Sequence, residues 1–318
     1  IKQTNKKMTE IIRKKLSDSA GARWTALLIV AFTMMMGYFI TDVMSPLEVI
    51  LETSKEQGGL GWSSSDYGFF AGSYGLINVF MLMLFFGGII LDKMGIRFTG
   101  VMASGLMVVG VIIKYFGVTT DFGDSKFTLD FVNFSLPMSA AIASLGFAIF
   151  GVGCEICGIT ISKIITKWFT GHELALAMGV QVGLARLGTT AAMAGSLPLA
   201  KAFGNHVSAP ILLGLVLLIA GFLAFIVYTV MDKKLDASTG EVTGNVSDED
   251  EGFHFADLKF IFTNPGFWCI TLLCLMFYSG VFPFLKFATK LMVDNYNVPQ
   301  DLAGSLPGAI PLGTIILT

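Results

Sequence analysis

The sequence predicts an all-α integral membrane protein, because long apolar runs alternate with short charged connections along its 318 residues. Hydrophobic residues make up 54% of the chain and charged residues only 14%, whereas soluble domains carry roughly 25% charged residues. The mean hydropathy is +0.72. Since unsatisfied backbone groups are costly in lipid, apolar runs of this length are expected to be helices.

A helix needs about 20 apolar residues to cross the hydrocarbon core of a bilayer. By this criterion we expect spans at 24–46, 67–91, 98–117, 138–162, 174–200, 207–231 and 264–289, and an eighth that begins near 301. The chain then divides into an N-terminal segment (1–23), a six-helix bundle (24–231), a linker with a short interfacial helix (232–263) and the start of a second bundle (264–318). Six helices, a linker and further helices are typical of a transporter built from two halves. We expect the chain to be part of a protein of about 12 spans.

Glycines recur within these spans and favour close approach of neighbouring helices. The pair Gly179 and Gly183 has the spacing of a small-residue packing motif. The full set comprises the glycines at 72, 75, 87, 88, 151, 153, 179, 183 and 188.

The distribution of basic residues predicts the orientation of the chain. Residues 1–23 contain seven Lys and Arg against two acidic residues and no cleavage pattern, which indicates a cytoplasmic segment and not a signal peptide. Basic residues also occupy the connections 92–97 and 163–173, whereas 47–66 and 118–136 are acidic or mixed. By the positive-inside rule the N-terminus is cytoplasmic. We expect a monomeric, multi-pass protein of a bacterial cytoplasmic membrane.

A charged turn follows the second predicted span, with the sequence Gly88-Ile-Ile-Leu-Asp92-Lys93-Met-Gly95-Ile-Arg97. Gly88 is expected to let a neighbouring helix approach, and Gly95 to permit a tight reversal into the third span. Asp92 is expected to pair with Lys93 or Arg97 and to face a helix N-terminus. The stretch resembles the signature G-x-x-x-D-[RK]-x-G-x-[RK] of the major facilitator superfamily. The resemblance implies the fold of that superfamily and a cytoplasmic latch that holds while the substrate site faces outward.

Ionisable residues inside spans are costly and are by default functional hypotheses. Glu155 and Arg186 lie about 15 residues before and after the turn at Thr170-Gly171, so both are on the order of 20 Å from it. This matched depth permits an ion pair. The two residues either form a structural clamp between helices or also line a solute site.

Further candidates lie near the outer ends of the first and seventh spans. Asp42 stands shortly before Pro46 and either bonds locally or serves the site, with Tyr38 one turn away. Tyr74 in the second span could face the same vestibule, and Lys286 lies in the seventh span with Lys290 beyond it.

The fourth and fifth spans narrow the resemblance. Phe150-Gly-Val-Gly-Cys-Glu155 and the stretch from Trp168 through Gln181 and Arg186 to Thr189 resemble the branch of the superfamily that includes the lysosomal dipeptide transporters. The resemblance implies a peptide-like substrate whose ammonium end meets Glu155 and whose carboxylate end meets Arg186. Gln181 belongs to the same matching stretch, and Lys286 would assist at the carboxylate.

Two departures from the superfamily limit this assignment. Phe147 stands where many members carry an arginine. The fifth span lacks the glycine–proline signature of drug antiporters, which argues against drug/proton antiport.

The sequence therefore predicts a secondary active or facilitative transporter of a small charged or zwitterionic solute, short peptides included, that works by alternating access. Protons are a candidate coupling ion through Glu155 or Asp42. The alternatives are an anion porter of the nitrate or oxalate/formate type and a membrane receptor or scaffold without transport activity. An enzyme is not expected, because no His/Asp/Ser set lies at one depth.

No cofactor, metal or nucleic-acid partner is expected. The three histidines fall in connections, and the net charge of −2 comes without a basic face. Cys154 and Cys157 have C-x-x-C spacing, but inside an apolar run they are interpreted as small packing residues.

Overall fold

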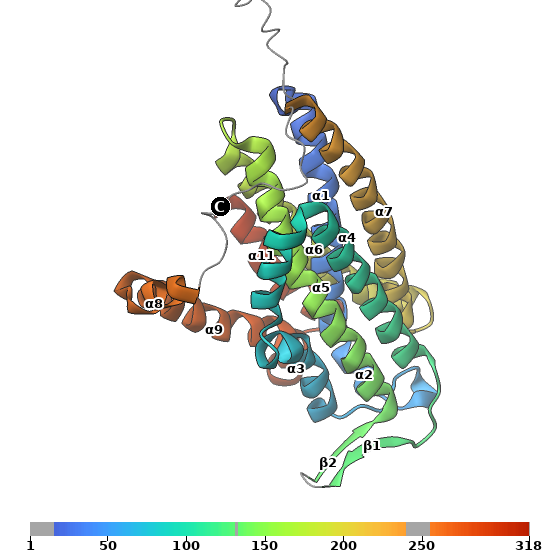
Figure 1. The fold of residues 1–318 in the computed structure, drawn as a ribbon. Coiled ribbons are helices and arrows are strands. Elements are labelled where there is room, and N and C mark those ends of the chain that lie inside the picture. Colours follow the sequence, from blue (N-terminus) through green and yellow to red (C-terminus); the bar gives the residue numbers. More distant parts are fainter. Residues whose placement is uncertain (1–15, 131–132, 240–254, 318) are drawn as a thin grey trace, which may run out of the picture.

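The structure, a computed structural model, describes residues 16–130, 133–239 and 255–317. Long helices lie side by side and a two-stranded hairpin projects from one end of the bundle (Figure 1). In chain order the elements are η1 (Leu16–Asp18), α1 (Ala20–Asp42), η2 (Ser45–Leu47), α2 (Glu48–Glu52), η3 (Lys55–Gln57), α3 (Ser64–Phe80), α4 (Met83–Thr119), β1 (Lys126–Leu129), β2 (Phe134–Pro137), α5 (Met138–Phe169), α6 (Leu174–Ala202), α7 (Ser208–Thr239), α8 (Phe255–Thr263), α9 (Pro265–Tyr296), α10 (Gln300–Ala303) and α11 (Ser305–Leu317). Within the described residues, six helices are long and apolar enough to cross a membrane.

The second predicted span differs from expectation, because the helix breaks at Met81 and Leu82. Leu82 has a φ of 50°, so the chain changes direction there and α4 begins at Met83. α4 contains both the end of the second predicted span and all of the third. Its two helical segments meet at Gly95, whose φ of 77° and ψ of 170° are readily available only to glycine. The predicted reversal at Gly95 is confirmed.

The described chain also departs from the predicted pattern at its connections. β1 and β2 form an antiparallel hairpin inside a segment that was expected to be a plain connection. α7 continues to Thr239, past the predicted end of its span, and α8 is a short helix within the predicted linker, whose interfacial position stays a prediction. Residues 1–15 and the acidic run Asp248–Glu251 lie outside the described residues. The division of the chain into two bundles stays a prediction.

Glycines hold the closest helix pairs together. A Cβ at Gly110 of α4 would collide with the backbone of Phe150 on α5, and one at Gly146 of α5 would collide with the backbone of Lys114. A Cβ at Gly188 of α6 would likewise collide with the backbone of Met35 on α1. These three positions therefore set the separation of α4 from α5 and of α1 from α6.

Several glycines predicted from spacing do not have this role. Among the described residues, a Cβ at Gly72, Gly88 or Gly179 would meet nothing within 4 Å, so the expected close helix approach is not seen at these three positions. Gly183 faces only a side-chain atom of Ile315 on α11, at 3.7 Å. Spacing along one helix does not reveal which face a neighbour occupies.

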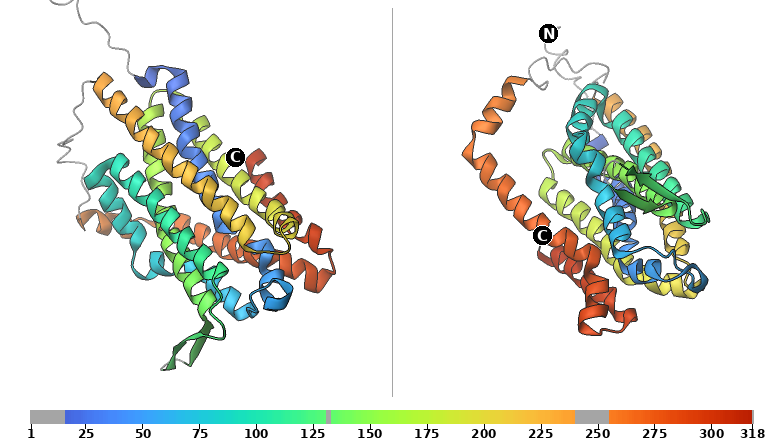
Figure 2. Two further views of the ribbon diagram at one scale, coloured as in Figure 1. Left: turned by 90° about the vertical axis from the view of Figure 1, so that its right-hand side faces the viewer. Right: turned by 90° about the horizontal axis from the view of Figure 1, so that it is seen from below.

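α9 joins the bundle through its second half only. Its first half and the described side chains of α8 are exposed, and in Figures 1 and 2 this arm extends obliquely away from the other helices. Its buried residues are Leu285, Ala288 and Thr289. α9 therefore contacts the bundle near the end that carries β1 and β2, which we call the hairpin end. The opposite end carries Gly95.

Candidate functional site

A cavity of about 370 Å³ lies between α1, α3, α5 and α9. Four of the predicted site residues line it: Tyr38, Tyr74, Glu155 and Lys286. The remaining lining residues are Thr41, Gly68, Ala71, Gly72, Gly75, Phe282, Pro283 and Phe287. The cavity is thus mostly apolar or aromatic, with one carboxylate and one ammonium group on its wall. Its volume falls within the range of small-molecule sites, about 300–1,000 Å³.

Glu155 is held by a tyrosine from a neighbouring helix. The hydroxyl of Tyr74 on α3 donates a hydrogen bond of 2.7 Å to Glu155 Oε1 on α5. A hydrogen bond to a carboxylate is about twice as strong as one between neutral groups. The Tyr74 ring itself lies against Phe147 and Phe150, with centroids 5.4 and 6.2 Å away. Glu155 therefore has a defined orientation on the cavity wall.

Arg186 lies close to the ring of Tyr38. Its guanidinium carbon is 5.7 Å from the centroid of the Tyr38 ring, within cation–π range. Among the described residues no ion pair joins Glu155 to Arg186, although Tyr38 interacts electrostatically with both. The predicted Glu–Arg clamp is therefore not formed among the described residues, and Tyr38 is a neighbour of both charges. Gln181 is half-buried on α6 and does not line the cavity.

Asp42 forms an ion pair with Lys286 on α9, the helix that contains the seventh predicted span. Lys286 Nζ lies 2.7 Å from Asp42 Oδ1, and it also donates to the carbonyl of Thr41. The pair is well shielded, since the side chains are 12% and 7% exposed. This ion pair joins the end of α1 to α9.

Two further contacts fasten α9 at the hairpin end. Lys290 Nζ lies 2.6 Å from Glu52 Oε2, and the Tyr67 hydroxyl donates to the Lys286 carbonyl at 3.1 Å. No comparable contact holds the exposed first half of α9 within the described residues. The bundle is therefore closed between α9 and its neighbours at the hairpin end.

Lys114 is a functional candidate that the sequence analysis missed. It lies on α4, is fully buried, and donates to the Ile40 carbonyl at 3.2 Å. Its ammonium group is 4.6 Å from the centroid of Phe147 and 5.4 Å from that of Phe70. A cation thus lies beside Phe147, the position where the family resemblance implied an arginine. A lone lysine in a span was itself the signal that could have revealed it.

Glu48 was missed because it lies in a connection where acidic residues are ordinary. The structure buries it completely, and neither carboxylate oxygen has a hydrogen-bond partner among the residues that the structure describes. Burial of an unpaired polar group is costly, so this position is under strain in the observed arrangement.

The charged turn after the second span pairs differently from expectation. Asp92 Oδ1 lies 2.7 Å from Lys163 Nζ on α5, so the predicted pairing with Lys93 or Arg97 is wrong. Lys93 is exposed, and Arg97 instead reaches Asp236 on α7 at 2.9 Å. The reason is geometric: neighbours in sequence point to different faces of the turn, whereas α5 and α7 pass beside it.

The Arg97 contact belongs to a buried network at the opposite end. Lys167 lies 2.8 Å from Asp232 and 2.7 Å from Asp236, and Asp232 is completely buried. Trp168 Nε1 donates to the Tyr228 hydroxyl at 3.1 Å beside the same carboxylates. This network fastens α4, α5 and α7 to one another.

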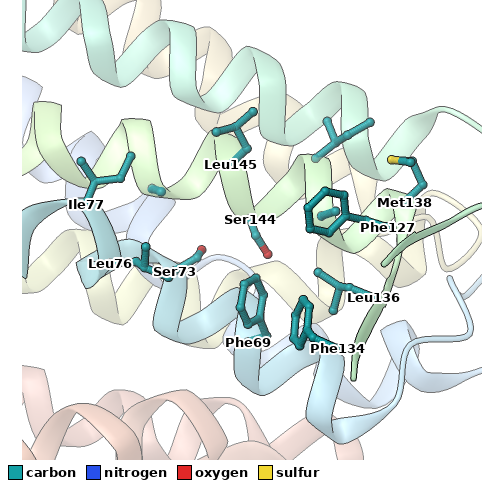
Figure 3. Close-up of a pocket in the computed structure, with 13 residues that line it drawn as sticks. Phe69, Ser73, Leu76, Ile77, Phe127, Phe134, Leu136, Met138, Ser144 and Leu145 are labelled. Carbon is teal, nitrogen blue, oxygen red and sulfur yellow. The ribbon is translucent and has the colours of Figure 1, made fainter. Parts of the chain in front are cut away.

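A second cavity, of about 380 Å³, lies between α3, α5 and the hairpin (Figure 3). Its wall is formed by apolar side chains such as Phe69, Phe134 and Leu145, and only Ser73 and Ser144 bring polar side chains. Its described lining residues include no charged one. The cavity is therefore unsuited to a charged solute.

The cysteines match the predicted packing role. Cys154 and Cys157 are buried and unpaired in α5. In the part of the chain that the structure describes, no group of three or more His, Cys, Asp or Glu residues could hold a metal ion.

The family model of the Major Facilitator Superfamily matches residues 27–318. The chain belongs to this superfamily. The predicted fold class is thereby confirmed, together with the resemblance seen at the Asp92 turn.

Curated relatives carry one name, lysosomal dipeptide transporter MFSD1. The protein from Danio rerio is 24% identical over 230 residues, covering 68% of this chain and 44% of the relative. That from Bos taurus is 22% identical over 298 residues, covering 91% and 57%. That from Homo sapiens is 22% identical over 239 residues, covering 72% and 47%. The chain spans about half the length of the curated relatives it matches.

Solved structures confirm the fold. The xylose transporter XylE from E. coli, in a partially occluded inward-open conformation, aligns with a TM-score of 0.62 at 11% identity, covering 92% of this chain and 71% of XylE. A D-xylose-proton symporter aligns with a TM-score of 0.58 at 11% identity, covering 92% of this chain and 66% of its own.

Proposed function

We propose that this chain forms the solute-binding half of an alternating-access transporter for small zwitterions, with short peptides as the substrate class. The observation that carries the proposal is the arrangement of opposite charges around one cavity. Glu155, Lys286 and Tyr38 line its wall, and Arg186 lies within cation–π range of the Tyr38 ring with no ion pair to Glu155 among the described residues. A zwitterion supplies both missing partners at once, which compensates charges that are otherwise poorly paired.

In this proposal Glu155 receives the ammonium group, and Arg186 receives the carboxylate with Lys286 assisting. A dipeptide extends about 7 Å, so its two charges can bridge residues that are too far apart to pair directly. The name of the curated relatives supports the same substrate class. The protein would act as a carrier and not as an enzyme.

In this proposal the opposite end of the bundle lies in the cytoplasm and the hairpin end outside, as the positive-inside rule favours. Closure of α9 at the hairpin end then corresponds to a site open toward the cytoplasm. A bacterial cytoplasmic membrane and a monomeric state stay predictions, and the matched curated relatives are vertebrate proteins named for the lysosome.

The test is uptake by the full-length protein in proteoliposomes, with a free dipeptide, its N-acetylated form and its C-terminal amide as matched solutes. Glu155→Gln should weaken uptake of the free dipeptide by at least about tenfold and abolish its advantage over the N-acetylated form. Arg186→Ala should also weaken uptake of the free dipeptide by at least about tenfold, and it should abolish the advantage of the free dipeptide over its C-terminal amide. Glu56→Gln, at an exposed position on η3, is the control and should behave as the parent. Normal dipeptide uptake by either site variant would overturn the proposal.

One observation favours the anion-porter alternative: Lys114, Arg186 and Lys286 bring cations from three helices to the same region. An anion porter would take up the N-acetylated dipeptide as well as the free one, and Glu155→Gln would not weaken this uptake. Absence of uptake of every solute by folded protein would support the receptor or scaffold alternative. Repeating the assay with and without a pH gradient tests proton coupling.

A further inference from the structure

Two ammonium groups meet the C-terminal end of α1. Lys286 on α9 binds the Asp42 carboxylate at 2.7 Å and the Thr41 carbonyl. Lys114 on α4 binds the carbonyl of Ile40 at 3.2 Å. The end of a helix carries negative partial charge, and here a carboxylate adds a full one, so the site attracts cations.

The two lysines share one aromatic surface. Lys114 Nζ is 4.6 Å and Lys286 Nζ is 5.7 Å from the centroid of Phe147. Lys114 interacts electrostatically with both Asp42 and Lys286. It has no carboxylate within ion-pair distance among the described residues, because Lys286 already occupies Asp42.

The two lysines differ in how the helices that carry them are held in the bundle. Lys114 is carried by α4, whose backbone is closely packed on α5 through Gly110 and Gly146, and α5 in turn contacts α1. Lys286 is carried by α9, which follows the linker and joins the bundle only through its second half. Any opening at the hairpin end that moves α9 away removes Lys286 from Asp42 and leaves Lys114 in place.

Without a replacement, that movement would leave a buried carboxylate without a partner, which is strongly unfavourable. The lysine side chain has a flexible four-carbon stem with an ammonium at its end. Lys114 already interacts with the last turn of α1, where Ile40 precedes Asp42 by two residues. A change of rotamer, without movement of α4, is the step needed to transfer its ammonium group from the carbonyl to the carboxylate.

We propose that Lys114 is a positioning residue that takes over the Asp42 carboxylate when α9 withdraws Lys286, so that Asp42 stays paired whether the hairpin end is closed or open. The exchange lowers the cost of opening. It rests on the alternating access of the proposed function and is independent of the solute.

The test measures opening directly, in the absence of solute, and therefore remains valid if the proposed substrate is wrong. Ser45 of η2 is 2% exposed and lies where α9 packs, so Ser45→Cys reports opening at the hairpin end. Ser125, exposed before the hairpin, provides the control Ser125→Cys, which reports access of the reagent in every state. Both are placed in full-length protein whose native cysteines are replaced by alanine, and the rate of labelling by a membrane-impermeant maleimide is measured from the hairpin side.

Lys114→Gln keeps a donor for the Ile40 carbonyl but removes the charge. It should slow labelling at Ser45→Cys by about tenfold, with labelling at Ser125→Cys unchanged. Lys114→Arg should restore the parental rate, because it keeps the cation. In an Asp42→Asn background, where no cation is needed, Lys114→Gln should change the rate by less than about twofold.

Two results would overturn the proposal. One is a parental labelling rate in Lys114→Gln. The other is equal slowing by Lys114→Gln with Asp42 retained and in the Asp42→Asn background, which would assign Lys114 a purely structural role. If Lys114→Gln is not monodisperse, Lys114→Met takes its place, both with Asp42 retained and in the Asp42→Asn background. A parental labelling rate, or equal slowing in both backgrounds, would again overturn the proposal.

Discussion

The hydroxyl of Tyr74 lies 2.7 Å from Glu155 Oε1, so a side chain of α3 orients the carboxylate that α5 presents to the cavity. Tyr74→Phe removes this hydrogen bond and keeps the ring that packs against Phe147. Hydrogen bonds to charged groups contribute about 1.5–3 kcal/mol, so the half-saturation concentration for a free dipeptide should rise about tenfold.

Uptake titrations in proteoliposomes measure this change. Tyr115→Phe is the matched control, since the described structure shows no hydrogen-bond partner for the Tyr115 hydroxyl. An unchanged half-saturation concentration in Tyr74→Phe would show that the hydrogen bond does not orient Glu155 for binding.

The ion pairs at the opposite end should differ in their contribution to stability. Lys167 bonds to Asp232, whose side chain is completely buried, whereas Lys163 and Asp92 are each 50% exposed. Removing one partner of a buried pair costs about 3–5 kcal/mol, and an exposed pair contributes at most about 1 kcal/mol. Lys167→Met should therefore lower the melting temperature of the purified protein strongly, and Lys163→Met only slightly. Equal shifts in thermal unfolding would contradict this ranking.

Gly146 and Gly179 should respond in opposite ways to alanine. A Cβ at Gly146 would collide with the backbone of Lys114, so Gly146→Ala should separate α4 from α5 and lower the melting temperature. Gly179→Ala meets nothing within 4 Å, and alanine is favoured over glycine in a helix by about 1 kcal/mol, so it should be neutral or slightly stabilising. Thermal unfolding of the two variants, side by side, tests the close packing of α4 on α5. A stable Gly146→Ala would argue against it.

Glu48 offers a stabilising substitution. Both carboxylate oxygens are buried without a partner, and Glu48→Gln replaces a group that can carry charge by a neutral one of the same shape. The melting temperature near neutral pH should rise by about 2–4 °C. Glu52→Gln is the control and should lower the melting temperature, because it removes the carboxylate that lies 2.6 Å from Lys290. A lower melting temperature for Glu48→Gln would show that the carboxylate has a partner in the folded protein.

Much of the architecture could be predicted from the sequence because a bilayer imposes simple rules. Apolar runs near the length that crosses a membrane predicted the long helices, and Gly95 predicted the reversal that its positive φ confirms. The break at Leu82 could not be predicted, since the apolar run continues through it without interruption.

The candidate site could be predicted only as a set of residues. Tyr38, Tyr74, Glu155 and Lys286 were named from charge, depth and resemblance, and the fold brings all four to one cavity. Partners were harder to predict: Asp92 pairs with Lys163 and not with its sequence neighbours. A partner depends on which helix passes beside a side chain, and that information is not local.

The sequence by itself determined that the chain is a helical membrane protein of the superfamily and which charges lie within its spans, because hydrophobicity and the Asp92 turn are local properties. Only the tertiary structure decided how those charges pair. It placed Arg186 against the ring of Tyr38, joined Asp42 to Lys286 and set Lys114 beside them. The physical reason is that inside a bilayer each charge needs a neighbour, and only helix packing decides which neighbours are within reach.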